Sequence, residues 1–497
     1  MSSTNTTINM KDEKVALENL GDVEDGESVS NRTHIVKLEK QVVRRLDIVV
    51  MPTVIVLYLL AYIDRANIGN ARLAGLQKDL HMTDLQYKTA VTVTYIPLML
   101  VDIPTNLLLK KIGAGKMLPI LSITWGLITL LQSQVTSFGG LVTVRFFLGL
   151  VEGGLFPGML LYLSSFYCRA ELQVRITLFF AAVILSGAFS GLLAAAIQQM
   201  DGLRGLRGWQ WIFLLEGLLT ICCGMVGIFV LPSTPSKVLT FKKEHVDYCH
   251  HRLELDSNLF DKEHITVKAV LSIFKDSNFL IALPFYFASG SLGLGLSVFL
   301  PTIVAALGYS STNTQLLTVP PYTMAFIAAV ITSFISDRYR QRGLSAFTAG
   351  LVALAGGVIL YCGRGFGVRY TGTCLLVIGT YTFAPCTLAW LPNNIAGHAR
   401  RATALATLAM LTSAGGLAST WIYPTSSAPY FAFAARFNIA LICIMDTCVL
   451  LLLLRLRSQN RRKEEKPSEL LRGLEHLSEE EQFVVLGDHH PNYRYTY

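Results

Sequence analysis

The sequence predicts an all-α membrane protein with twelve transmembrane helices in two six-helix halves. Two observations lead to this prediction. The chain of 497 residues is 52% hydrophobic and only 15% charged, whereas an ordinary soluble domain carries about 25% charged residues. Apolar runs long enough to cross a bilayer also recur along the chain, because about 20 apolar residues in a helix span the hydrocarbon core.

A charged stretch from Pro232 to about Ser277 separates the first six apolar segments from the last six. The second segment of each half follows a similar motif, Thr83-Asp-Leu-Gln86 and Thr312-Asn-Thr-Gln315. In both motifs we expect the threonine and glutamine side chains to cap a helix start. This repeat favours a six-plus-six transporter. The expected segments are 47–70, 87–109, 117–136, 139–167, 174–199, 209–231, 278–305, 314–336, 344–363, 370–394, 402–424 and 434–456.

The regions outside the two halves are polar. We expect a disordered tail over 1–42, a first bundle over 43–231, a linker over 232–277, a second bundle over 278–457 and a second tail over 458–497.

His245 and Cys249 in the linker could place two metal ligands on one helix face, but a solvated helix is the favoured interpretation. The nine cysteines have no regular spacing, so we predict no disulfide framework, no metal site and no cofactor.

Basic residues determine the expected orientation. They gather in alternate loops on one side and in both tails, so the positive-inside rule places both termini in the cytosol. We expect a multi-pass protein of the plasma membrane, with an internal membrane as the alternative. The same distribution accounts for the net charge of +8 without a nucleic-acid partner. The basic loop residues on that side are Lys110, Lys111, Lys116, Arg169, Arg175, Arg338, Arg340, Arg342, Arg400 and Arg401.

Ionisable residues inside apolar segments are the first candidates for function. The fourth segment contains Arg145 and Glu152, which are seven positions apart. They therefore share one helix face but are separated by about 10.5 Å along the axis. A charge at mid-bilayer costs roughly 2.5–3.5 kcal/mol, so each needs a partner or a water-filled cavity. The two charges could serve only to join helices, but an ion and substrate pathway is the favoured interpretation.

Asp64 and Arg65 end the first apolar run. They point about 100° apart on a helix, so they could face one cavity without neutralising each other; a solvated pair at the helix end explains them equally well. Asp102 and Glu216 are expected to be structural acids. The cavity candidates in the second half are mostly polar and neutral, which suggests charge chemistry in the first half and shape selection in the second. The neutral candidates are Tyr322, Tyr381, Trp390, Asn393 and Asn394.

Several longer motifs accompany these residues. The first segment reads Tyr62-Ile-Asp64-Arg65-Ala-Asn67-Ile-Gly69-Asn70-Ala71, and the second contains Asp102-Ile-Pro104-Thr-Asn106. The second half contains Ser336-Asp337-Arg338, and the motif Asn492-Tyr-Arg494-Tyr495 lies among the last residues of the chain. From about Arg44 to Arg457 these motifs resemble the major facilitator superfamily, its anion:cation symporter group and, within that group, the fungal allantoate permease family. The loop Lys110-Lys111-Ile-Gly113 departs from the superfamily pattern because it lacks the usual acid.

The resemblance implies the major facilitator fold and proton-coupled symport of a small organic anion, a carboxylate or vitamin-like acid, by alternating access. It implies that Asp64 and Glu152 carry protons, that Arg65 contacts the substrate anion and that Arg145 helps to gate the neighbouring acid. Arginine suits this role because it stays charged and presents a planar fork to a carboxylate. The residues expected to bind substrate are Arg65, Arg145, Tyr322, Trp390 and Asn393. The residues expected to act in gating or structure are Asp102, Asp337 and Arg338.

Three other function classes compete with this interpretation. An exporter of a metabolite or toxic acid could use the same fold, because direction depends on coupling and location. A non-transporting nutrient sensor is less favoured, since the tails are modest in length. An enzyme is the least favoured, because no nucleophile–base pair, metal cluster or phosphate loop is evident in the sequence. We expect a monomer whose partners are a small organic anion, protons and the lipid bilayer.

Overall fold

The computed structural model describes residues 27–471 except 239, 259–270, 340, 425, 426 and 429, and also residues 473, 474, 476, 482 and 486–497. Every regular element among these residues is a helix, so the predicted all-α class is confirmed. Helices are the expected solution in lipid, because each one satisfies its own backbone N–H and C=O groups without water.

Within the described residues, the α-helices of the first half are seven longer ones and the short α3. Their bounds are α2 (Glu27–Leu73), α3 (Leu76–Asp79), α4 (Asp84–Ile112), α5 (Ala114–Gln132), α6 (Phe138–Glu152), α7 (Leu155–Ser164), α8 (Arg169–Ile197) and α9 (Gly208–Val230). A separate helix, α10 (Lys243–Asn258), lies in the predicted linker. The helix α2 begins at Glu27, so the described part of the region predicted as a disordered tail is helical.

The second half comprises six long helices. Their bounds are α12 (Ser277–Ala305), α13 (Ser311–Tyr339), α14 (Arg342–Cys362), α15 (Phe366–Asn393), α16 (His398–Ser419) and α17 (Ala432–Glu465). Among the residues that the structure describes after α17 are two short helices, α18 (Pro467–Leu470) and η6 (Gly487–His489). In the described residues, ten helices are long and apolar enough to cross a membrane: α2, α5, α8, α9 and α12 to α17. The other two predicted segments correspond to α4 and to the successive helices α6 and α7.

The fourth predicted segment is interrupted between α6 and α7 by Gly153 and Gly154. At this point α4 packs directly against the interruption. A Cβ atom on Gly153 would lie 2.7 Å from the carbonyl oxygen of Leu98, and one on Gly154 would overlap the side chain of Thr105. The glycines therefore allow two backbones to approach, and they end α6 at Glu152.

The two predicted helix caps have different outcomes. Thr83 caps α4 as expected, because its Oγ1 accepts the N–H of Gln86 at 3.2 Å and Gln86 Oε1 accepts the N–H of Thr83 at 2.9 Å. The corresponding prediction for Thr312 is wrong. The helix α13 already begins at Ser311, and both polar atoms of the buried Gln315 amide lack a hydrogen-bond partner in the described part of the chain.

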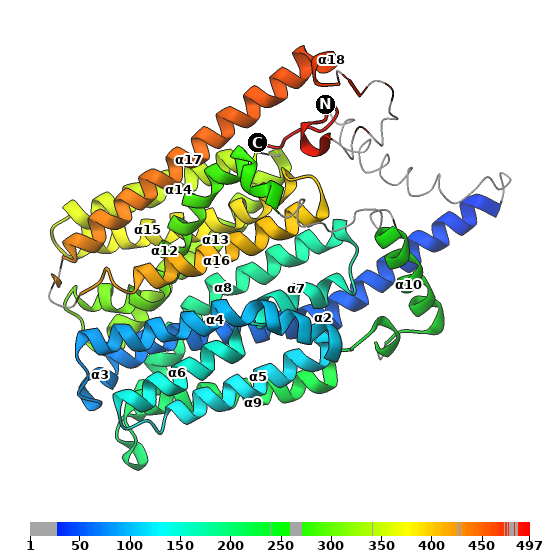
Figure 1. Ribbon diagram of the computed structural model, residues 1–497. Coiled ribbons are helices and arrows are strands. Elements are labelled where there is room, and N and C mark those ends of the chain that lie inside the picture. The colour runs from blue at the N-terminus through cyan, green and yellow to red at the C-terminus, as the bar shows by residue number, and fades with distance from the viewer. Residues whose placement is uncertain are drawn as a thin grey trace.

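The two halves lie side by side, and Figure 1 shows two distinct ends of the bundle. The start of α2, the end of α17 and the C-terminus lie at one end, which we call the terminal end; α3 lies at the opposite end, the α3 end. Near the α3 end the halves are joined by hydrogen bonds from Ser311 Oγ to the carbonyl of Leu73, 3.1 Å, and from Gln198 Nε2 to Ser311 Oγ, 2.7 Å. Close packing of Gly69 against the carbonyl of Val298 adds to this contact.

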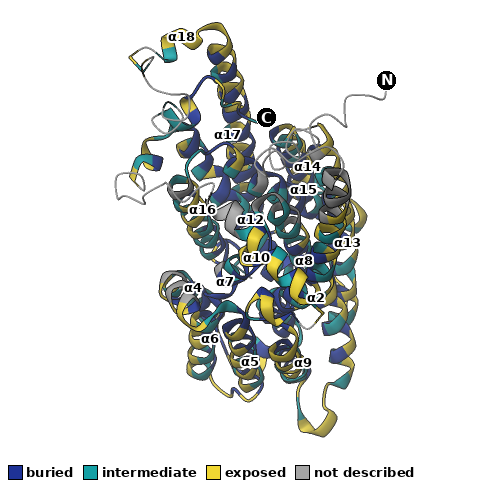
Figure 2. Cartoon of the chain, turned by 90° about the vertical axis from the view of Figure 1, so that its right-hand side faces the viewer, coloured by how far each residue is buried: buried dark blue, intermediate teal, exposed yellow. Residues whose placement is uncertain are grey.

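Many residues on the outer faces of the helices are exposed (Figure 2), and large apolar side chains are among the exposed residues. Phe229 on α9 is 81% exposed, and Phe334 on α13 is 70% exposed. Such extensive apolar exposure is unfavourable in water, but it is expected where the outer surface of a bundle contacts lipid.

Candidate functional site

The centre of the first half contains an ion pair between α2 and α6. Arg65 Nε donates to Glu152 Oε1 at 2.5 Å, and the Glu152 side chain is only 2% exposed. The Arg65 guanidinium also lies 4.8 Å from the centre of the Tyr62 ring. Glu152 is the last residue of α6, so the interruption after it places the carboxylate beside the neighbouring helix. A charge-assisted bond of this kind is stronger than a neutral one.

Arg145, two turns earlier on α6, is also buried. Its guanidinium carbon lies 5.8 Å from the centre of the Phe213 ring on α9. Within the described part of the chain, its Nε and Nη2 atoms have no hydrogen-bond partner. A buried donor left unpaired costs about 1–3 kcal/mol. The site therefore contains a cation whose unused donors would gain from an anionic ligand.

Asp64 faces away from this ion pair. Its Oδ2 accepts the indole Nε1–H of Trp125 at 2.9 Å, and its Oδ1 lies 3.5 Å from Asn67 Nδ2. Asp64 and Arg65 thus contact different neighbours, as the 100° rotation between successive helix residues predicts. The indole can donate but cannot accept, so Trp125 orients the carboxylate without neutralising it.

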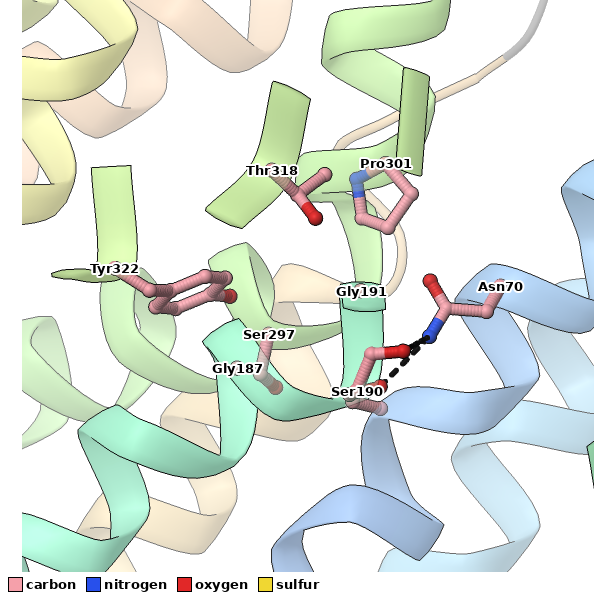
Figure 3. Close-up of a pocket in the computed structure, with 9 residues that line it drawn as sticks. Asn70, Gly187, Ser190, Gly191, Ser297, Pro301, Thr318 and Tyr322 are labelled. Atoms are coloured by element: carbon pink, nitrogen blue, oxygen red, sulfur yellow. Dashed lines mark hydrogen bonds between the residues drawn. The ribbon is translucent and has the colours of Figure 1, made fainter. Parts of the chain in front are cut away.

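A small pocket lies between the two halves (Figure 3). Asn70 from α2 and Ser190 from α8 line one side, and Asn70 Nδ2 donates to Ser190 Oγ at 2.7 Å. Thr318 and Tyr322 from α13 contribute from the second half. The structure therefore places Tyr322 in a pocket, whereas the guanidinium groups of Arg65 and Arg145 belong to the adjacent charged cluster of the first half. Tyr381 packs against Tyr322 with ring centroids 5.4 Å apart.

Trp390 and Asn393 lie elsewhere, in contact with the last residues of the chain. Trp390 Nε1 donates to the carbonyl of Thr496 at 2.9 Å, and the carbonyl of Asn393 accepts the hydroxyl of Tyr493 at 2.8 Å. Burial raises the pKa of Tyr493 to about 12, so its hydroxyl remains a donor. No local pattern in the sequence connects these residues with the tail, although the motif Asn492-Tyr-Arg494-Tyr495 marks the tail as distinctive.

The three residues expected in gating or structure lie in helices. Asp102 is in α4, and Asp337 is in α13, but their side chains fall outside the described part of the structure. Arg338 follows in the last turn of α13 and is exposed. Glu216, expected to be a structural acid, is buried on α9 and accepts a hydrogen bond from the Asn67 amide.

Comparisons with known proteins decide the family. The model of the Major Facilitator Superfamily matches residues 54–420. The chain belongs to this superfamily. As a major facilitator it is a multi-pass membrane transporter, and the predicted twelve-helix fold class agrees with this membership.

Relatives of this major facilitator include fungal transporters. "Uncharacterized transporter C1002.16c" of Schizosaccharomyces pombe is 37% identical over 399 residues, which cover 80% of each chain. "High-affinity nicotinic acid transporter" of Saccharomyces cerevisiae is 31% identical over 477 residues, which cover 95% of this chain and 87% of the yeast protein. These relatives extend the similarity over nearly the whole described bundle.

Solved structures of major facilitators share the fold. A bacterial homologue of the human lysosomal transporter Spinster, inward-facing and unoccupied, has a TM-score of 0.65 at 14% identity, covering 81% of this chain and 95% of its own. A D-xylose-proton symporter has a TM-score of 0.62 at 14% identity, covering 82% of this chain and 97% of its own. At this level of identity the similarity concerns the fold alone.

Proposed function

We propose that this transporter moves a small organic anion together with protons by alternating access, as a member of the allantoate permease branch of the anion:cation symporters. The observation that carries the proposal is the ion pair between Arg65 and Glu152, 2.5 Å, beside the unpaired donors of Arg145. This arrangement combines a carboxylate that can take up a proton with two cations that can bind an anion.

Protonation of Glu152 would break its charge-assisted bond to Arg65. The planar guanidinium of Arg65 would then be available to a substrate carboxylate, which it can bind through two parallel hydrogen bonds. Without the proton, Glu152 and the substrate would compete for the same donors. Binding of the anion and the proton would therefore support each other, which is the requirement for symport.

The charge balance also supports coupling of the two ligands. A buried charge without a partner costs several kcal/mol, so a cavity with compensated charge rearranges more easily. Protonation of Glu152 removes one negative charge, and the substrate anion restores one beside Arg65 and Arg145. The site thus keeps a similar net charge through loading. The contacts near Ser311 that join the halves at the α3 end would separate when the transporter opens on that side.

One relative supports a carboxylate as the substrate class. The name of the 31% identical yeast protein specifies nicotinic acid, an aromatic carboxylic acid. Tyr322 and Tyr381 near the pocket between the halves would suit a flat or apolar body attached to such a carboxylate. We propose that the terminal end faces the cytosol, following the distribution of basic residues, and that the transporter lies in the plasma membrane.

The test is uptake of labelled carboxylates, nicotinate first, into cells that express the protein, with and without an inward proton gradient. Each proton that enters the cell down a gradient of one pH unit supplies about 1.4 kcal/mol, which is enough to accumulate the substrate about tenfold. We expect gradient-driven accumulation in the wild type and none beyond the no-gradient level in Glu152→Gln. Glu465→Gln is the matched control, because Glu465 forms an exposed pair with Arg461 at 2.6 Å.

Two results would contradict the proposal. Uphill uptake that persists in Glu152→Gln would remove this carboxylate from the coupling mechanism. If no acid accumulates at any gradient while preloaded cells lose label faster than cells without the protein, the transporter is an exporter, and the roles of Asp64 and Glu152 would belong to antiport.

A further inference from the structure

The Asn67 amide lies between two buried carboxylates. Its Nδ2 lies 3.5 Å from Asp64 Oδ1 and also donates to Glu216 Oε2. Asn67 is completely buried, and both acids are less than 4% exposed. Asp64 and Asn67 are one helical turn apart on α2, whereas Glu216 comes from α9, so the contact depends on the packing of these two helices.

The two acids have only neutral hydrogen-bond donors in the described part of the chain. Asp64 Oδ2 is bound by the Trp125 indole, and Glu216 Oε1 has no partner. Glu152 differs from both because it is paired with Arg65. Two negative charges that share one neutral amide in a low-dielectric site repel each other, and one of the two carboxyls then retains a proton.

The hydrogen-bond donors around each acid indicate which carboxyl holds the proton. The charged groups near Asp64 are Glu152 and Arg145, both from α6 and of opposite sign, so their effects oppose each other. Asp64 also accepts the indole N–H of Trp125 at 2.9 Å, in addition to facing the Asn67 amide. The charged group near Glu216 is Asp64 itself. Glu216 accepts only from the Asn67 amide, and its Oε1 is buried without a donor in the described part of the chain; a carboxyl bound by fewer N–H donors is the one that keeps its proton. The proton therefore belongs to Glu216 in this conformation.

A chain of polar side chains connects this pair of acids with the pocket between the halves. Ser190 Oγ donates to Asn67 Oδ1 at 3.5 Å and accepts from Asn70 Nδ2 at 2.7 Å. Ser190 and Asn70 both line the pocket, opposite Tyr322 of the second half (Figure 3). A ligand in the pocket, or separation of the halves, would compete for Ser190 and Asn70. The Asn67 amide would then be free to turn away from one of the two acids.

We propose that Glu216 is a proton-holding residue and that Glu216, Asn67 and Asp64 form a unit, the bridged acid pair, that shares one proton. When Glu216 releases the proton, the carboxylate of Asp64 accepts it, so this transfer leaves the pair with one negative charge and nothing is oxidised or reduced. Asp64 then releases the proton to water on the side to which the transporter opens, and Glu216 takes up the next proton, so one proton passes through the pair in each cycle. This inference rests on the proposed proton coupling and deepens it. The pair adds a second proton site to the one at Glu152 and links it to the state of the pocket.

The direct test is infrared absorption of the purified protein in lipid vesicles at neutral pH, taken as wild type minus variant. We expect Glu216→Gln to lose one carboxylic-acid C=O stretching band. Glu171→Gln is the matched control, because Glu171 pairs with Arg252 at 3.0 Å and should lose only a carboxylate band. Glu216→Asp, which keeps the acid group, should retain a carboxylic-acid band and shows that the site tolerates substitution.

A second readout is the dependence of uptake on external pH. We expect the proton dependence of Glu216→Gln to fall by about one proton relative to the wild type, since glutamine imitates the protonated acid. Asn67→Leu should produce the same flattening, because it removes the bridge and leaves both acids in place. A variant that only loosens the fold would lower uptake equally at every pH, and that result would overturn the assignment.

The outcomes separate this inference from the proposed function. If Glu216→Gln loses the acid band but no gradient drives uptake in the wild type, the bridged acid pair exists and proton symport is wrong. If the difference spectrum shows the loss of a carboxylate band instead, Glu216 is ionised and the inference fails, whatever the uptake assay shows.

Discussion

The last residues of the chain bind back onto the second half, and this contact allows a quantitative prediction. Asn460 on α17 donates from Nδ2 to the carbonyl of Tyr495 at 2.9 Å and accepts the N–H of Tyr495 at Oδ1, 3.0 Å. Both residues are buried. Asn394 at the end of α15 binds the N–H and carbonyl of Thr496 in the same manner, at 2.7 and 3.1 Å. Two asparagine side chains therefore hold two successive peptide groups of the tail.

Asn460→Ala would remove both hydrogen bonds to Tyr495 and leave a buried N–H and a buried C=O without partners. Each unpaired buried group costs about 1–3 kcal/mol. Because the two groups can relax partly toward water, we expect the free energy needed to open the tail to fall by about 3 kcal/mol. Since 1.4 kcal/mol corresponds to a factor of ten, the tail should open about 100-fold more often.

Amide hydrogen exchange measures this opening directly, because protected amides exchange only when the local structure opens. We expect the Tyr495 and Thr496 amides to exchange about 100-fold faster in Asn460→Ala than in the wild type. Asn393→Ala is the control, since Asn393 contributes its backbone carbonyl to Tyr493 and its side chain is exposed. The reasoning would be refuted by unchanged exchange in Asn460→Ala, or by an equal acceleration in the control.

Two further predictions concern packing. Arg252→Ala should weaken the attachment of α10 to the bundle by about 2–3 kcal/mol, because Arg252 forms a charge-assisted bond to Glu171 at 3.0 Å. We expect limited proteolysis to cleave α10 faster in this variant. An unchanged cleavage rate would contradict the prediction. Gly153→Ala should destabilise the protein by about 1–3 kcal/mol, since its Cβ would lie 2.7 Å from the carbonyl of Leu98. Thermal unfolding in detergent measures this change, and Gly139→Ala, with no atom within 4 Å of its Cβ, should have no comparable effect.

Local patterns in the sequence were sufficient for the helices and their order. Apolar length identifies a transmembrane helix because lipid leaves the backbone no other way to satisfy its polar groups. The Thr83 cap was also predictable, because both of its hydrogen bonds join residues three positions apart. The Thr312 cap was not, because α13 begins one residue earlier, where Ser311 binds Leu73 and Gln198 of the other half.

The individual candidates for the charged site were likewise visible in the sequence, because an ionisable residue in an apolar segment requires a partner. Which partner each one has was not visible. Helical periodicity indicates the face on which a side chain lies, but not the helix that packs against that face. Arg65 and Glu152 are 87 positions apart, and Asn67 and Glu216 are 149 apart.

The sequence by itself thus determined the class of fold, the order of the helices and the set of buried charges. Only the tertiary structure decided that Glu152 pairs with Arg65, that Glu216 shares an amide with Asp64, and that Trp390 contacts the tail. The physical reason is the range of the interactions. Helix formation and burial in lipid depend on neighbours along the chain, whereas the partner of a buried polar group depends on how helices distant in sequence pack together.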